Sequence, residues 1–192
     1  MLNLSGNYFW EEKSVELHKG RPLTKERRLD KEVRTYDLLD ELGIEYWRVD
    51  HEPAMTIEAC HDVEKVLGTN ICKNLFLCNT QKTCFYLLVM PGDKKFQTKI
   101  VSKQLGVARL SFAPEEFMLE YLDITPGSVS IMGLMNDHNK KVRLLVDSDL
   151  LQDEYFACHP CINTSSIKMS TKAVFNRFLP KIGCEATFLN LE

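Results

Sequence analysis

The sequence contains few glycines and prolines and no long hydrophobic run, and these absences exclude several classes of protein. Nine glycines and seven prolines in 192 residues are too few for a collagen-like or low-complexity chain. The longest apolar run, residues 84–90, is far shorter than the roughly 20 residues of a membrane-spanning helix. The first residues have neither a basic start nor an apolar segment, so we expect no secretory signal. Hydrophobic residues make up 44% of the chain, which excludes a disordered protein and predicts roughly one globular domain.

A basic excess is absent as well. The 24 Lys and Arg residues face 27 Asp and Glu residues, which gives a net charge of −3. Proteins that cover themselves with nucleic acid usually carry a basic excess, so we expect no DNA binding and only local contact with one end of a folded RNA. The basic residues that could form a local RNA-binding patch are Lys94, Lys95, Lys99 and Lys103. The alternative interpretation is that they belong to a solvated helix face.

Cofactor and metal motifs are also missing. The chain has no G-x-G-x-x-G, P-loop or G-x-S-x-G motif, so we predict no cofactor and no serine nucleophile. The seven cysteines are an odd number in a chain without an export signal, which favours a reducing cytoplasm. Cys158 and Cys161 form a C-x-x-C pair, but the chain lacks a second ligand pair with suitable spacing, so we predict no metal site. A thiol oxidoreductase is the alternative, although this pair ends a predicted strand instead of opening a helix.

Hydrophobic periodicity predicts an α+β domain with a curved, mixed sheet flanked by helices. Residues 1–23 lack this periodicity and are expected to form an N-terminal extension, whose Tyr8-Phe9-Trp10 cluster either packs as extra core or serves as an interface arm. Residues 24–192 are expected to form the domain. Helices are predicted over residues 24–42, 56–68, 98–105, 115–121 and 170–178. Strands are predicted over residues 44–51, 71–77, 84–90, 109–112, 142–146, 155–158, 165–169 and 186–189.

Lys73 is the most informative single residue. It lies in an apolar strand, where a period of two places its side chain on the same face as Leu75 and Leu77. A buried ammonium group is costly unless it meets an anion or carbonyl oxygens. Lys73 therefore lies either at the bottom of a ligand cleft or near the exposed start of the strand, where it would reach water.

Two loops supply further candidates. Residues 125–130 place Pro126-Gly127 before small polar residues, which suits backbone N–H groups that hold an oxyanion, although an ordinary type II turn has the same pattern. His159 precedes a proline and is interpreted either as a polar group at the rim of the Lys73 cleft or as a hydrogen-bonded turn residue.

Several of these motifs occur in an order that resembles the YbaK/ProX family, the free-standing relatives of the editing domain of bacterial prolyl-tRNA synthetases. The resemblance covers residues 28–190, and the ProX branch fits better than the YbaK branch. The motifs are His51-Glu52-Pro53, Cys72-Lys73-Asn74-Leu75-Phe76-Leu77, Pro91-Gly92-Asp93, Leu110-Ser111-Phe112-Ala113, Thr125-Pro126-Gly127-Ser128-Val129-Ser130, Asn136-Asp137 and His159-Pro160 with Asn163-Thr164.

The resemblance implies a partly barrel-like sheet and hydrolysis of the ester that joins a wrong amino acid to the 3′-terminal adenosine of tRNA(Pro), with alanine as the first expectation. A ribose hydroxyl of the substrate is implied to help activate water. The implied catalytic residues are Lys73, Gly127, Ser128 and His159. The implied substrate-binding residues are Asn74, Val129, Ser130, Cys158, Pro160 and Asn163.

The sequence departs from the ProX pattern beside the implied pocket. Cys158 stands where that branch often has phenylalanine, and Ile131-Met132 replaces the more usual Pro-Phe. These changes predict a roomier pocket, so removal of cysteine, serine or threonine is an alternative to removal of alanine. A non-catalytic module that binds an aminoacyl-tRNA or an amino acid is a further alternative. The expected partners are the acceptor end of mischarged tRNA(Pro) and prolyl-tRNA synthetase, in the cytoplasm and without a membrane.

Overall fold

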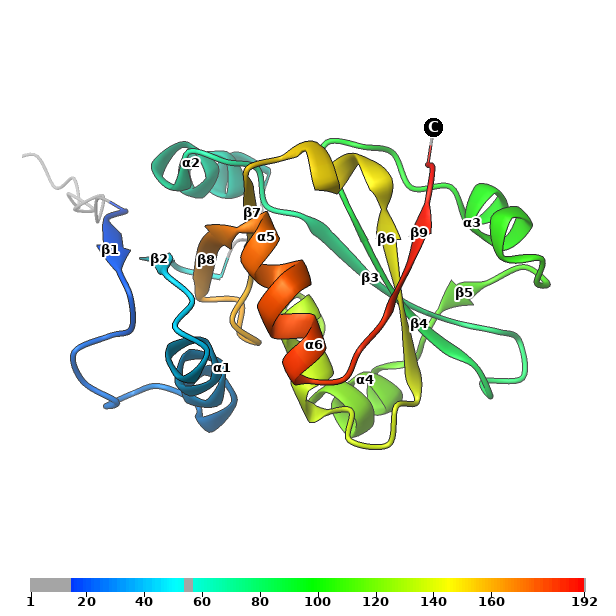
Figure 1. Cartoon of the computed structure of the whole chain (residues 1–192), viewed down its shortest axis with the longest axis horizontal. Helices are drawn as coiled ribbons and strands as arrows, with labels where there is room; N and C mark the ends of the chain where they lie inside the picture. The colour runs from blue at the N-terminus through cyan, green and yellow to red at the C-terminus, as the bar shows by residue number, and fades with distance from the viewer. Residues whose placement is uncertain (1–14, 54–56, 192) are drawn as a thin grey trace, which may run out of the picture.

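The strands form two sheets that lie side by side (Figure 1). In this computed structural model the described residues are 15–53 and 57–191, so the predicted Tyr8-Phe9-Trp10 cluster and the first residue of the helix predicted over 56–68 lie outside them. The first sheet is antiparallel and has the order β1 (Leu17–Lys19), β2 (Tyr46–Asp50), β8 (Ser165–Ser170) and β7 (Tyr155–Cys158). The second has the order β5 (Ser111–Phe112), β3 (Lys73–Cys78), β4 (Phe85–Met90), β6 (Val142–Asp147) and β9 (Ala186–Leu189).

The second sheet is mixed. β3 pairs antiparallel with β4 and β5, whereas β6 runs parallel to β4 and to β9. The helices are α1 (Asp30–Glu41), α2 (Ile57–Leu67), α3 (Thr98–Leu105), α4 (Glu115–Leu122), the short η1 (Ile131–Asn136) and η2 (Ser148–Gln152), and a run of α5 (Thr171–Ala173), η3 (Val174–Phe178) and α6 (Leu179–Lys181). The α+β prediction is therefore confirmed, with the strands divided between two sheets.

Most of the elements begin and end near the predicted residues. Gly43, Gly68 and Gly106 each follow a helix and adopt positive φ angles of 60°, 67° and 65°, the left-handed conformation that favours glycine at a helix end. The last helix continues past the predicted end at Phe178 to Lys181, through a π-helical segment at Val174–Phe178. The two 3₁₀ helices were not predicted, because segments this short carry too little periodicity.

The end of the predicted N-terminal extension takes part in the first sheet. β1 pairs with β2, so that Leu17 faces Val49 and Lys19 faces Trp47. Arg21 then binds the carboxylates of Asp37 and Asp40 on α1, at 2.6 and 3.2 Å. Residues 17–21 are therefore attached to the domain on both the β2 and the α1 side.

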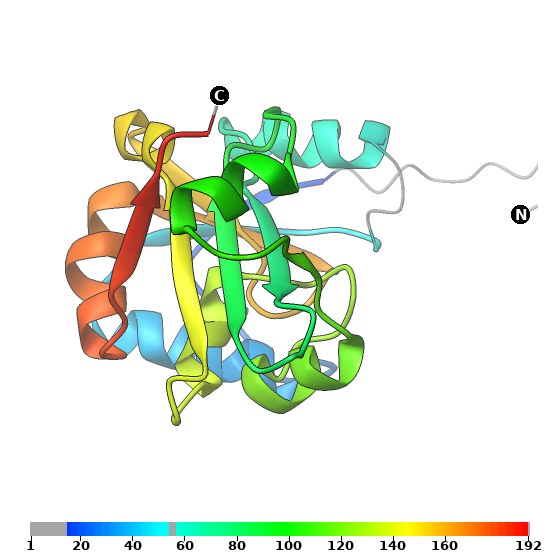
Figure 2. The same cartoon turned by 90° about the vertical axis from the view of Figure 1, so that its right-hand side faces the viewer.

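The main core lies between the two sheets, where the α5–η3–α6 run crosses the molecule (Figure 1). Phe156 and Met169 of the first sheet, Leu144 and Val146 of the second, and Phe178 of the helix all contribute to it. Each sheet has a second apolar face. α2 covers that of the first sheet through Val63 and Leu67. α3 covers that of the second sheet through Val101, and Figure 2 shows α3 in front of the strands.

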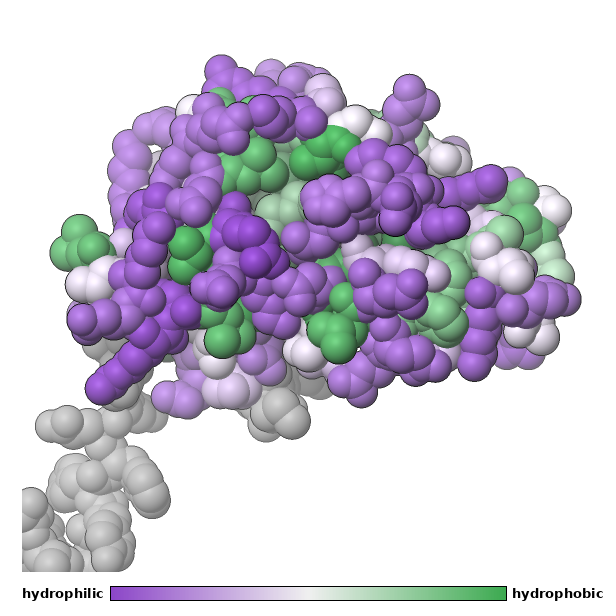
Figure 3. Space-filling model, turned by 90° about the horizontal axis from the view of Figure 1, so that it is seen from below, coloured by the Kyte–Doolittle hydropathy of each residue, from purple (hydrophilic) through white to green (hydrophobic). Residues whose placement is uncertain are grey.

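Seen from below, the surface of the molecule is mostly hydrophilic with separate hydrophobic patches (Figure 3). Within the described residues, no helix is long and apolar enough to cross a membrane.

Candidate functional site

A cavity of about 420 Å³ lies where α2, the start of β3 and the end of β7 meet. The two sheets join here, because the Cys72 N–H donates to the Ala157 carbonyl at 2.9 Å. Lys73 and His159, two of the predicted catalytic residues, both line this cavity. The other lining residues are His51, His61, Val63, Glu64, Asn70, Ile71, Cys72, Gly92, Asp93 and Ser166.

Lys73 is half-buried at the first position of β3. Its Nζ donates to the Lys94 carbonyl oxygen at 2.6 Å. Among the described residues no carboxylate lies within ion-pairing distance of Lys73, whereas Lys94 pairs with two. An ammonium group has three donors, so Lys73 keeps two that can bind a ligand in the cavity.

The Lys94 side chain holds the loop whose carbonyl binds Lys73. Its Nζ lies 2.8 Å from Asp147 and 2.7 Å from Asp149. Asp147 is fully buried at the end of β6, and its other oxygen accepts the Asp149 N–H. Burial lowers the pKa of Lys94, but the hydrogen bonds to these carboxylates outweigh it and the pKa is raised. Lys94 is thus paired within the protein. Of the predicted RNA patch, Lys95, Lys99 and Lys103 remain as candidates for contact with RNA.

Two histidines share one serine hydroxyl at the other side of the cavity. Ser166 Oγ lies 2.9 Å from His51 Nε2 and 3.3 Å from His159 Nδ1. The two Nδ1 atoms also contact carbonyl oxygens, of Glu52 at 2.8 Å and of Ser165 at 2.9 Å. A carbonyl only accepts, so both rings carry their proton on Nδ1 when neutral.

This tautomer leaves the Nε2 lone pair of His159 as an acceptor. Burial lowers the pKa of His159, the Ser165 carbonyl opposes this, and His51 adds to it, with a net decrease. His159 is therefore neutral at pH 7, in the form that can accept a hydrogen bond or a proton.

The Gly127 loop forms a type II turn. Gly127 has φ +83°, and the Ser128 N–H donates to the Thr125 carbonyl at 3.1 Å. The Ser128 hydroxyl donates to the same carbonyl at 2.8 Å, so neither group of Ser128 is free in this conformation. A Cβ at Gly127 would lie 3.5 Å from Asn163 Nδ2, which places the turn against the loop that follows His159.

The other predicted binding residues lie under the cavity. Asn74 points to the main-core side of β3, and its Oδ1 accepts the Ile131 N–H at 2.9 Å. Ser130 is fully buried, and its hydroxyl accepts the Met132 N–H at 3.2 Å. Val129 packs against the main core, and Pro160 is buried. These residues support the loops beside the cavity and do not line it.

Cys158 and Cys161 are both fully buried in the main core. Cys158 does not line the cavity, so the expectation that it points toward the bound amino acid needs correction: β7 turns Ala157 toward α2 and Cys158 toward the main core. Burial raises the pKa of both thiols, that of Cys161 to about 12, although hydrogen bonds with Ser130 and Thr35 oppose it. Neither thiol is the reactive thiolate that a redox enzyme needs.

Sequence reasoning gave no chemical role to several residues that line the cavity. His51 and Gly92 belong to motifs that carried the family resemblance. Glu64 and Ser166 had no local signal, because a carboxylate on a helix and a serine in a strand are common on solvated faces. A Cβ at Gly92 would lie 2.3 Å from the Ile71 carbonyl oxygen, so the Pro91-Gly92-Asp93 turn requires glycine here to close against β3.

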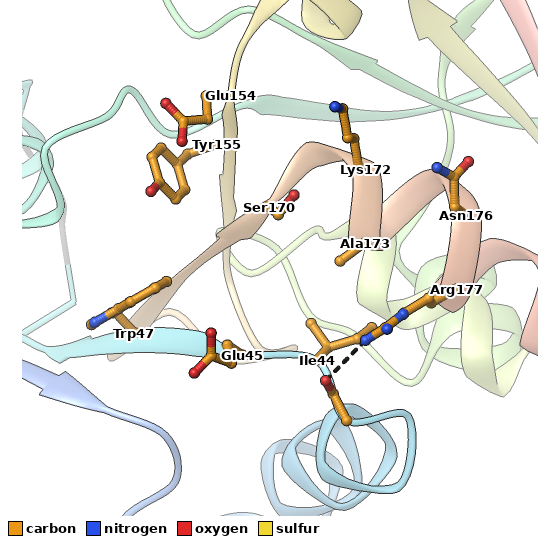
Figure 4. A pocket seen from close by; sticks show the side chains of 11 residues that line it. Ile44, Glu45, Trp47, Glu154, Tyr155, Ser170, Lys172, Ala173, Asn176 and Arg177 are labelled. Atoms are coloured by element: carbon orange, nitrogen blue, oxygen red, sulfur yellow. Dashed lines mark hydrogen bonds between the residues drawn. The ribbon is translucent and has the colours of Figure 1, made fainter.

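A second cavity, of about 490 Å³, lies between β2 and the α5–η3 run (Figure 4). Trp47 and Tyr155 stand at one side, and Arg177 reaches across the other side to the Gly43 carbonyl at 3.0 Å. Lys168 Nζ already lies over both aromatic rings, at 5.5 and 4.9 Å. This cavity contains none of the predicted catalytic residues. Within the described residues, no group of three His, Cys, Asp or Glu side chains could hold a metal ion.

The burial of the C-x-x-C pair generates one prediction. Cys158 and Cys161 should resist alkylation by iodoacetamide in the folded protein and react fully in denaturant, because both thiols are buried and protonated. Peptide mass spectrometry after timed labelling measures this, with the half-buried Cys84 and Cys184 as internal references. Rapid labelling of either core cysteine in the folded state would contradict the structure.

The lowered pKa of His159 leads to a second prediction, on how stability depends on pH. Below the unfolded-state pKa of about 6.5, the unfolded chain binds a proton that the folded His159 resists, so stability should fall as the pH falls from 7.5 to 5. His159→Gln cannot titrate and should show a smaller difference in urea midpoint between these two pH values. An equal difference in both proteins would mean that other groups cause the pH dependence.

The ion pairs of Lys94 with Asp147 and Asp149 lead to a third prediction. Lys94→Met should lower the free energy of unfolding by about 2–3 kcal/mol, because it leaves the buried Asp147 carboxylate without its cation. Asp149→Asn removes a mostly exposed carboxylate of the same network and should cost less than about 1 kcal/mol. Urea unfolding of the two variants makes the comparison, and equal losses would show that Asp147 does not depend on Lys94.

The sequence matches the model of the family described as "Aminoacyl-tRNA editing domain" over residues 51–176. It is 35% identical over 132 residues to the "Prolyl-tRNA editing protein ProX" of Acetoanaerobium sticklandii, a match that covers 69% of this chain and 80% of that protein. It is 29% identical over 145 residues to the "Prolyl-tRNA synthetase associated domain-containing protein 1" of Danio rerio, covering 74% of this chain and 78% of that protein.

The fold agrees with these sequence relationships. A crystal structure described as that of a candidate trans-editing enzyme for prolyl tRNA synthetase superimposes with a TM-score of 0.62 at 16% identity, over 85% of this chain and 99% of that one. At this identity the similarity supports the fold, and the sequence matches carry the family. The resemblance inferred from the motifs is confirmed, and the chain belongs to the aminoacyl-tRNA editing domain family.

Proposed function

We propose that this protein is a trans-editing deacylase that hydrolyses the ester of mischarged tRNA(Pro), with alanyl-tRNA(Pro) as the main substrate. The observation that carries the proposal is the ammonium group of Lys73, which lines a cavity with a neutral histidine and, among the described residues, has a backbone carbonyl and no carboxylate as its partner. The relative from Acetoanaerobium sticklandii, named a prolyl-tRNA editing protein, supports the choice of tRNA.

The chemistry needs little from the protein, because an aminoacyl ester is already activated. Lys73 donates to the ester carbonyl oxygen, or to the phosphate of the terminal adenosine, and so stabilises negative charge that develops during attack. A water molecule attacks the carbonyl carbon, the bond to the ribose oxygen breaks, and that oxygen takes a proton. The His159 Nε2 can accept a hydrogen bond from the attacking water, and a ribose hydroxyl of the substrate shares this role.

The Gly127 turn acts on the site through the loop that contains Asn163. Gly127 and Ser128 do not line the cavity, and the Ser128 N–H is used within the turn, so the turn positions the Asn163 loop and Lys73 stabilises the oxyanion. The cavity of about 420 Å³ admits a small amino acid with its ribose. Rejection of proline is then steric, since the rigid ring needs space that the packed walls do not yield.

The tRNA itself contacts the region around α3. Lys99 and Arg109 line a neighbouring hollow with Gln97, Thr98 and Ser102, and Lys95 lies in the loop before this helix. These cations supply the local phosphate contacts that an overall acidic chain can offer. Prolyl-tRNA synthetase is the partner that would deliver a mischarged tRNA(Pro).

The proposal predicts the behaviour of Lys73→Ala. This variant should lose roughly 10²-fold or more in kcat on alanyl-tRNA(Pro), because it removes the cation that faces the reacting carbonyl. Lys65→Ala removes an exposed lysine from α2 and should keep full activity. Urea unfolding confirms that both variants are folded. Near-normal turnover by folded Lys73→Ala would exclude the catalytic role.

The amino acid is identified by a deacylation panel on tRNA(Pro) charged with Ala, Cys, Ser, Thr and Pro. The proposal expects the highest kcat/KM for alanine and none for proline. A higher value for Cys, Ser or Thr would assign the protein to another small amino acid. Binding without turnover on every substrate would favour the non-catalytic alternative.

A further inference from the structure

The cavity contains a carboxylate and an ammonium group that do not pair with each other. Glu64 of α2 and Lys73 of β3 both line it, and no ion pair joins these two side chains. Lys73 Nζ is directed to the Lys94 carbonyl instead. Opposite charges kept apart in one cavity are complementary to a ligand that carries a positive and a negative group at separate places.

The protein holds the Glu64 carboxylate in place by one of its oxygens. Oε1 accepts the Ile71 N–H at 2.9 Å, just before β3 begins. Oε2 lies 3.3 Å from His61 Nδ1, on a ring whose side chain is 62% exposed and which carries charge only when protonated. The Glu64 side chain itself is only 19% exposed. A carboxylate oxygen accepts more than one hydrogen bond, so both oxygens keep acceptor sites for a cation.

An aminoacyl ester has one formal charge on its amino-acid part, the α-ammonium group, because its carboxyl group is esterified. We propose that Glu64 binds this α-ammonium group and so selects esters with a free amino group. The inference rests on the proposed deacylase function. Asp93, the other carboxylate among the described residues that line the cavity, is exposed and lies in a loop, so water competes there for a cation.

The two contacts together select a class of substrate. With Lys73 on the carbonyl or phosphate and Glu64 on the ammonium, the ester is held at both ends and its side chain faces the remaining wall. An N-acylated ester, such as a formylated aminoacyl-tRNA or a peptidyl-tRNA, lacks the charge and adds bulk at the Glu64 side. The enzyme would therefore spare such esters and act on unblocked aminoacyl-tRNA.

The test compares alanyl-tRNA(Pro) with lactyl-tRNA(Pro), in which a hydroxyl replaces the ammonium group. Glu64→Gln keeps an oxygen for the Ile71 N–H and removes only the charge. It should lower kcat/KM on the alanyl ester about 10- to 100-fold, mainly through KM, and leave the lactyl ester unchanged. Asp62→Asn removes an exposed carboxylate of the same helix, which pairs with Lys65, and should change neither.

Equal losses on both esters would overturn the proposal, because they would show that Glu64 only supports the cavity, and so would unchanged kinetics on both. Binding of an amide-linked 3′-(alanylamino)adenosine and of its lactyl counterpart, measured by calorimetry, tests the contact without turnover. If the wild type does not hydrolyse any ester, the deacylase function fails. A weaker alanyl and an unchanged lactyl affinity in Glu64→Gln would still support the ammonium contact, and equal affinities of Glu64→Gln and the wild type for the alanyl analogue would refute it.

Discussion

One backbone hydrogen bond, from the Cys72 N–H to the Ala157 carbonyl, fixes the place where the two sheets meet. Each sheet packs one face against the common core and leaves the other face to a single helix, α2 or α3. The bond between Cys72 and Ala157 sets how far the start of β3 lies from the end of β7. Lys73 directly follows the first of these residues and His159 lies two positions after the second, so the geometry of the candidate site depends on this contact.

The site also depends on an electrostatic constraint. A half-buried ammonium group and a largely buried carboxylate lie in the same cavity, and each is held by the backbone instead of by the other. Among the described residues their charges are compensated only in part, since a backbone dipole does less than a counter-ion. The packing of the two sheets offsets that cost, and the proposed substrate, with its complementary groups, would compensate both charges. The Lys94–Asp147 ion pair fixes the loop whose Lys94 carbonyl accepts the hydrogen bond from Lys73.

For the buried thiols, the spacing in the sequence and the position in the fold indicate different roles. Cys158 and Cys161 have the spacing of a redox or metal pair, yet both lie in the main core, where burial keeps the thiols protonated. A phenylalanine at position 158 would have to fit among core residues such as Ile167 and Met169 and would overpack them before it narrowed the cavity. The difference from the ProX pattern at this position therefore concerns the packing beneath the loops.

Much of the fold follows from local sequence signals. Residues 98–105, 155–158 and 186–189 form the predicted elements because their apolar period matches one helix face or one strand, and glycine ends the helices where a left-handed residue is needed. The motif around Lys73 identified the family and placed this lysine in a strand. The division of the strands into two sheets could not be read from periodicity, since it depends on which strands pair over long distances in the chain.

The sequence by itself determined the family and the α+β class, and it singled out Lys73 as the first candidate residue of the site. Only the tertiary structure decided which residues share the cavity with it. Glu64 on α2 and Ser166 on β8 have no local feature that distinguishes them from solvated residues, and Asn74, next to Lys73 in the chain, points to the other face of its strand. The reason is geometric: a binding site is made of residues whose side chains converge in space, and sequence patterns report only the periodicity of each separate element.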